Sequence, residues 1–260
     1  MFTYTDIADS IESIDSHFYI TCPKSQYIYD CGCQFCKNIL DLFENSNPQK
    51  YESNFEMFPY VGLYYMREKE FEKAYSFLRI SSNRNDRIGK FYLGLFYRSH
   101  NDINSMIDCF KQSAELNYSV AMIALGDYYE SIEDDENTLR WYMNASKKKN
   151  LDADNYIGRF YDERDDFKNA IHYYKKSINE YKNRDSMFCL ALLYKKINDE
   201  DNMLKFYMMA SEYGCNRADN NIASYYRYVL GDNEKALKYY LKGIEKGDKL
   251  AKENLADFLK

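Results

Sequence analysis

Four cysteines near the start of the chain are the residues whose type and spacing could hold a metal ion. Cys22, Cys31, Cys33 and Cys36 follow the pattern C-x8-C-x-C-x2-C. Zinc takes four thiolate or imidazole ligands in a tetrahedron, and a turn that presents Cys33 and Cys36 is a familiar half-site. Two interpretations stay open: a zinc site, or reduced structural thiols in a small cap. No cofactor is expected elsewhere in the protein.

No arrangement of residues in the sequence is typical of an enzyme. The sequence lacks a G-x-S-x-G nucleophile turn, a glycine-rich phosphate loop and an H-E-x-x-H zinc motif. His100 and His172 lie far apart in the sequence, and neither belongs to a recognisable catalytic set. We therefore expect a protein that is not an enzyme.

Composition excludes two classes of partner. The net charge of −6 and the pI of about 5.3 argue against nucleic acid, which requires a basic surface. No apolar run approaches the roughly 18 residues of a membrane span, so no membrane insertion is expected. Residues 1–6 lack the basic and apolar parts of a signal peptide. We expect a cytoplasmic protein, in the host cytoplasm if it originates from a virus or an intracellular parasite.

From about residue 51 the sequence repeats every 32 or 33 residues. Each repeat has a small residue, here called position zero, with an aliphatic residue before it. In the six full repeats a tyrosine follows at position +3, and the last, partial copy has Leu259 there. The small residues are Gly62, Gly94, Gly126, Gly158, Ala191, Ala223 and Ala256. Positions −5, −1 and +3 are four residues apart, so they share one face of a helix. All three prolines lie within the first 60 residues, which leaves a long stretch without a helix breaker. A period of this length predicts an array of helices.

A second helix follows in each repeat. It opens with an acidic residue suited to capping a helix N-terminus, as at Asp102, Asp134 and Asp166. A large residue at position +16 and a small residue at position +19 follow on its inner face. The small residue at position zero would let this second helix approach closely, and the tyrosine at +3 would supply a large buried area with a polar tip.

This pattern resembles the tetratricopeptide and Sel-one-like helical repeats over roughly residues 54–260. Gly158, Tyr161, Ala170, Tyr174 and Ser177 match the signature of small, Tyr, Ala, aromatic and small residues. The period is shorter than the tetratricopeptide's 34 residues, and the closing proline is missing. The resemblance implies an all-α, right-handed α-solenoid of about six antiparallel helix pairs plus a C-terminal capping helix. This repeat array would span residues 51–260, and residues 1–50 would form a small irregular cap that contains the cysteines.

The resemblance also implies where a partner would bind. In such arrays the first helices line a concave surface, and positions −3, +1 and +4 share its exposed face. The candidate binding residues at these positions are Phe91, Leu95, Asp127, Asn155, Arg159, Asn220 and Arg227. The implied function is a non-enzymatic scaffold or adaptor that binds a peptide or helix of a protein partner. The alternative is a zinc-binding recognition module at the N-terminus, with the repeat array as a spacer.

Overall fold

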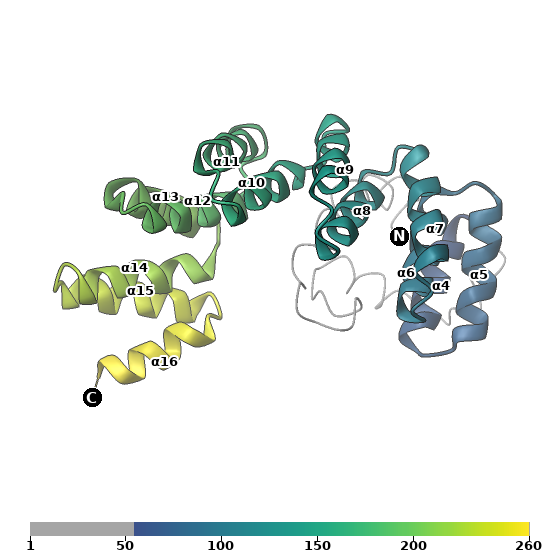
Figure 1. The fold of residues 1–260 in the computed structure, drawn as a ribbon. Helices are drawn as coiled ribbons and strands as arrows, with labels where there is room; N and C mark the ends of the chain where they lie inside the picture. Colours follow the sequence, from purple (N-terminus) through teal and green to yellow (C-terminus); the bar gives the residue numbers. More distant parts are fainter. Residues whose placement is uncertain (1–54, 260) are drawn as a thin grey trace. The chain divides into compact units, whose positions relative to one another are not determined.

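A computed structural model describes residues 55–259. This part of the protein is all-α: the short 3-10 helix η2 (Phe55–Met57) is followed by thirteen α-helices, α4 to α16. As predicted, the described helices form six antiparallel pairs and one final helix (Figure 1). The predicted N-terminal cap and its four cysteines lie outside the described residues. No described helix has both the length and the apolar composition needed to cross a bilayer.

The described helices belong to two compact units, residues 55–150 and residues 151–259. In the first unit, the first helices of the pairs are α4 (Phe58–Arg67), α6 (Arg87–Ser99) and α8 (Ser119–Ser131). Their second helices are α5 (Phe71–Asn83), α7 (Ile103–Glu115) and α9 (Asp135–Lys147).

The second unit has the same organisation. Its first helices are α10 (Ala153–Glu163), α12 (Arg184–Lys196) and α14 (Asn216–Tyr228). The second helices are α11 (Phe167–Tyr181), α13 (Glu200–Glu212) and α15 (Asn233–Glu245), and α16 (Lys249–Phe258) ends the array.

The two helices of a pair meet where the small residue at position zero faces the large side chain at position +16. A Cβ added at Gly158 would lie 2.6 Å from Cδ1 of Tyr174. The +16 side chains of the first five pairs are almost fully buried: Leu78, Phe110, Tyr142, Tyr174 and Tyr207. In the sixth pair the fully buried tyrosine is Tyr240, at position +17. This confirms the predicted close approach, because only a small residue leaves room for the facing ring.

In four of the described pairs, the tyrosine at position +3 stacks on an aromatic side chain of the second helix. Ring centroids lie 5.8 Å apart for Tyr161 and Tyr173 and 5.6 Å apart for Tyr194 and Phe206. Their planes are within 12° of parallel. Aromatic pairs of this kind add specific geometry to ordinary burial.

Every turn between consecutive described helices contains a residue in the left-handed region. The left-handed residues are Lys69, Asn85, Asn101, Asn117, Glu133, Lys149, Asp165, Lys182, Asn198, Gly214, Gly231 and Gly247. Each brings the backbone round so that the next helix can start at once. After Glu133, the Asp134 N–H donates to the Tyr129 carbonyl oxygen at 2.9 Å, and the Asp134 carboxylate accepts from the Asn137 N–H at 3.1 Å. The predicted acidic caps are therefore confirmed here, and also at Asp102 and Asp166.

Candidate interaction site

Two of the predicted binding residues are core residues of the first unit. Phe91 and Leu95 are each only 1% exposed. The Phe91 ring stacks on Phe110 at 5.5 Å and meets the Tyr118 ring edge-on at 5.4 Å. The expectation that these two side chains lie exposed is therefore wrong. Large apolar groups gain most when removed from water, and here their neighbours cover them.

Two asparagines of the second unit are also buried rather than exposed. Asn155 is 5% exposed and Asn220 is 4% exposed. Ser186 on α12 donates a hydrogen bond to Oδ1 of Asn155 on α10 at 3.0 Å. Asn254 on α16 donates to Oδ1 of Asn220 on α14 at 2.8 Å. The two side chains thus join consecutive first helices, as buried polar groups with partners do.

The remaining three predicted residues keep some exposure. Asp127 is half-buried and accepts a hydrogen bond from the Tyr142 hydroxyl at 2.7 Å. The Arg159 side chain is 42% exposed and lies 3.6 Å from the Glu163 carboxylate. The Arg227 side chain is 19% exposed, with Asp257 at 3.8 Å.

The first helices of the second unit present three different side chains at position +1. They are Arg159 on α10, Leu192 on α12 and Ser224 on α14, and we call them the +1 row. Leu192 is 40% exposed, as are several other large apolar side chains among the described residues. The predicted binding residues included none from α12, although the same spacing identifies Leu192 at +1 and Lys195 at +4.

Ion pairs hold the first helices of this unit beside one another. Lys196 lies 3.6 Å from Asp162, and Arg217 lies 3.4 Å from Asp185. Partial burial raises the pKa of the Asp162 carboxyl, and Lys196 partly offsets this effect. Exposed pairs contribute little stability individually. They link α10 to α12 and α12 to α14, the helices that carry the +1 row.

The described residues contain no group of three or more His, Cys, Asp and Glu side chains placed to hold a metal ion. Cys22, Cys31, Cys33 and Cys36 lie outside them, so zinc binding there stays a prediction. Among the described cysteines, burial raises the pKa of Cys109 and of Cys189 to about 11. Both are therefore neutral thiols near pH 7, which is the unreactive form.

Comparison with known proteins identifies the fold. No protein-family model matches the sequence, and no curated protein is significantly similar to it. Solved structures do match. A Sel1 repeat protein from Oxalobacter formigenes aligns with a TM-score of 0.59 and 19% identity, over 78% of this chain and 88% of that one. The pilF protein of Pseudomonas aeruginosa aligns with a TM-score of 0.58 and 15% identity, over 78% of this chain and 97% of that one. A subunit of the APC/C hetero-tetramer Cut9-Hcn1 aligns with a TM-score of 0.55 and 13% identity, over 98% of this chain and 53% of that one. The fold is that of tetratricopeptide and Sel1-like repeats.

Proposed function

We propose that this tetratricopeptide-like protein is a non-enzymatic scaffold or adaptor that binds a segment of a protein partner on the first-helix face of its second unit. The fold is generally non-catalytic and typically serves protein interaction. The observation that supports this site is the +1 row. Its neighbours at positions −1, zero and +3 repeat from pair to pair and serve packing, whereas Arg159, Leu192 and Ser224 differ in chemistry and keep exposure.

The +1 row specifies the chemistry of the partner segment. Arg159 favours an acidic residue, Leu192 an apolar residue and Ser224 a hydrogen-bonding residue. Packed helices lie about 8–10 Å apart, and a peptide in the polyproline II conformation rises about 3.1 Å per residue with three residues per turn. Residues i, i+3 and i+6 of such a peptide share one face and therefore match the three positions. Arg227 and Asp127 remain candidates for flanking contacts, while Phe91, Leu95, Asn155 and Asn220 would act only through packing.

Proteins of similar fold occur in assemblies, and the Cut9-Hcn1 hetero-tetramer of the APC/C is one of them. A likeness at this level of identity carries the architecture and not the partner. The proposal therefore rests on the side chains of the second unit, and the partner is defined by the sequence pattern that the +1 row accepts.

Selection of binders from a random peptide library against the full-length protein tests this proposal. We expect selected peptides to carry an acidic, an apolar and a polar residue three positions apart. Leu192→Lys should weaken their binding by roughly tenfold or more, equivalent to ~1.4 kcal/mol. Leu241→Lys is the matched control, because Leu241 is 46% exposed on the second helix α15. Peptides that bind both variants as tightly as the wild type would refute this site.

A further inference from the structure

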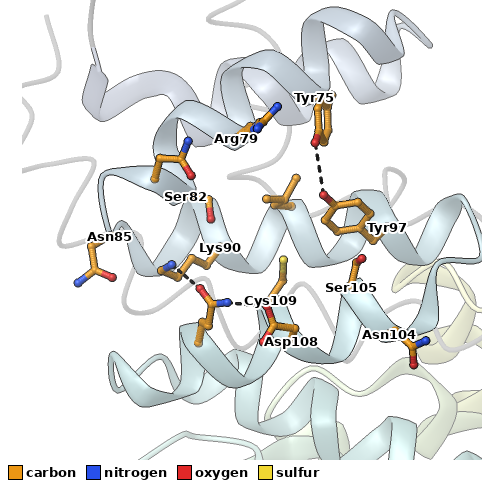
Figure 2. A pocket seen from close by; sticks show the side chains of 13 residues that line it. Tyr75, Arg79, Ser82, Asn85, Lys90, Tyr97, Asn104, Ser105, Asp108 and Cys109 are labelled. Atoms are coloured by element: carbon orange, nitrogen blue, oxygen red, sulfur yellow. Dashed lines mark hydrogen bonds between the residues drawn. The ribbon is translucent and has the colours of Figure 1, made fainter.

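The first unit contains a polar pocket of about 560 Å³ between its second helices α5 and α7. The first helix α6 forms its floor. Tyr75 and Tyr97 lie on one side of the pocket and Lys90 on the other, with Asp108 on α7 below (Figure 2). A volume of this size suits a small ligand or a few residues of a peptide. The pocket is separate from the first-helix face of the second unit.

Lys90 is an unusual lysine because it is only 8% exposed. Its ammonium group donates a hydrogen bond to Oε1 of Gln112 at 2.7 Å, and Gln112 in turn donates to Asp108 at 2.6 Å. No carboxylate among the described residues forms an ion pair with Lys90. An ammonium group has three donors, and burying its charge is costly without a charged partner.

The α10–α11 pair has an ion pair at the same two positions, with the lysine on the other helix. Lys90 is at position −4 of its repeat, and Gln112 is at +18. In the α10–α11 pair, these positions hold Asp154 and Lys176, which form an ion pair at 3.0 Å. In the α8–α9 and α12–α13 pairs, position −4 is an uncharged methionine, Met122 or Met187. The pair of Lys90 and Gln112 therefore keeps a buried cation at the helix contact and lacks the carboxylate.

The other groups of the pocket leave a positive excess. Arg79 adds a second cation, and Asp108 is the one carboxylate in the lining. The hydroxyls of Tyr75 and Tyr97 lie 3.5 Å apart, and the hydrogen bond between them raises the pKa of Tyr97 to about 12. Burial keeps Cys109 a neutral thiol. Near neutral pH, two cations therefore face one carboxylate, and neutral hydroxyl groups line the opposite side.

We propose that this pocket binds a carboxylate of an acidic peptide, with the Lys90 ammonium as its ion-pair partner. The bound carboxylate gives Lys90 the charged partner that Asp154 gives Lys176 in the α10–α11 pair. Arg79 lies at the pocket as a second cation for the same group, and the rings of Tyr75 and Tyr97 give the rest of the peptide an apolar wall. The carboxylate can belong to an acidic side chain or to the C-terminus of a peptide, since both present the same two oxygens.

Calorimetric titration of the full-length protein with short synthetic peptides tests the ligand chemistry. One probe is a tetrapeptide, Gly-Glu-Tyr-Gly, with both ends blocked; the second has Gln in place of Glu. The third is the Gln peptide with a free C-terminal carboxylate. We expect the Glu peptide, the free-acid peptide or both to bind at least about tenfold more tightly than the blocked Gln peptide, as for loss of a charge-assisted hydrogen bond. Equal binding of all three peptides, or binding of none, would overturn the proposal.

Lys90→Met tests the residue. Methionine occupies the same position in two other repeats, so we expect the variant to fold with an unchanged or raised Tm. Peptide affinity should fall by about tenfold or more. Lys111→Met is the matched control, because Lys111 is exposed on α7 outside the pocket and removes the same charge. Retained affinity in Lys90→Met, or an equal loss in Lys111→Met, would contradict the assignment.

A charge-neutral double variant gives an independent test. Combining Asp108→Asn with Gln112→Glu moves the pocket carboxylate beside the Lys90 ammonium without changing the net charge. The internal carboxylate should then exclude the peptide carboxylate while Tm is maintained. Undiminished peptide binding by this folded double variant would show that the ammonium of Lys90 is not the binding group.

Discussion

At the scale of single residues, the fold depends on a small residue that faces a large one. Tyr174 lies against Gly158, and the same contact recurs as Tyr142 against Gly126 in the α8–α9 pair. This contact could be predicted because position zero stays small while position +16 stays large. The closeness of the contact could not be predicted, because it depends on the distance between the two helix backbones in each pair.

Gly158→Ala tests how close this contact is. The added Cβ would lie 2.6 Å from the Tyr174 ring, which must shift. Overpacking costs about 1–3 kcal/mol, and the better helix propensity of alanine returns up to ~1 kcal/mol. We expect a net loss of about 1–2 kcal/mol in the free energy of unfolding, measured in urea. Asn179→Ala, exposed on α11, should not destabilise the protein.

The exposure of the candidate binding side chains could not be predicted from the sequence. Spacing correctly indicates that Phe91, Asn155 and Arg159 lie at equivalent or related places on first helices. It does not indicate what covers them. Phe91 is covered by rings from α7 and the following turn, and Asn155 is covered because Ser186 supplies a hydrogen bond from the next repeat. Both neighbours are remote in sequence, and only the packed array brings them together.

At the scale of elements, the turns carry information that the sequence shows only in part. Asparagine and glycine tolerate the left-handed conformation, and they occupy seven of the twelve left-handed positions. At the others a lysine, glutamate or aspartate takes the same conformation, as at Glu133 and Lys149. Their side chains gave no turn signal, so helix order was predictable but the common turn geometry was not.

Glu133→Gly should therefore stabilise the protein. Glycine removes a left-handed backbone cost of about 1–2 kcal/mol while adding ~0.5–1 kcal/mol of unfolded-state entropy. We expect a gain of roughly 0.5–1 kcal/mol in the free energy of unfolding. Glu136→Gly, three residues later in the first turn of α9, should instead cost up to ~1 kcal/mol. The same sign for both variants would contradict the role assigned to the turn.

The acidic caps predict how stability depends on pH. Hydrogen bonds from Ser105 lower the pKa of Asp102, those from Asn202 lower that of Asp199, and those from Lys235 lower that of Asp232. A depressed folded-state pKa adds stability above the unfolded value of 3.8, and this stability is lost as pH falls through the folded value.

We expect Tm to fall on acidification below about pH 4. Replacing all three capping aspartates by asparagine, which also caps helices, should reduce the fall of Tm below about pH 4. The Tm near neutral pH should stay similar to that of the wild type. A triple variant with the same acid profile as the wild type would show that other carboxylates control it.

At the scale of the whole molecule, the N-terminal cysteines and the repeat array can be tested separately, the cysteines for zinc binding and the array for stability. Under the zinc interpretation, purified full-length protein should contain about one zinc ion per molecule. Chelation should then increase the number of thiols that react quickly, and serine at Cys33 and Cys36 should prevent zinc uptake. Metal-free protein with reactive thiols before chelation would instead support reduced structural thiols.

The array itself should respond to damage locally, because each repeat contacts chiefly its neighbours. Asp219 on α14 tests this, since its buried carboxylate lies 2.6 Å from Lys246 and 3.6 Å from Lys242. It also accepts a hydrogen bond from Ser211 on α13 at 2.5 Å. Removing one member of a buried ion pair costs up to about 3–5 kcal/mol, and the partial exposure of both lysines lowers our expectation for Asp219→Ala to ~2–4 kcal/mol.

Hydrogen exchange resolved along the sequence would locate that loss. Faster exchange should concentrate in α14 and in the helices that contact it directly, α13, α15 and α16, and should leave α4 to α7 unchanged. Glu253→Ala on α16 removes an exposed acid and should alter neither region. A uniform rise in exchange across all described helices would mean that the array unfolds as one cooperative body. The packing of Asp219 would then set the stability of the whole molecule rather than of its own repeat.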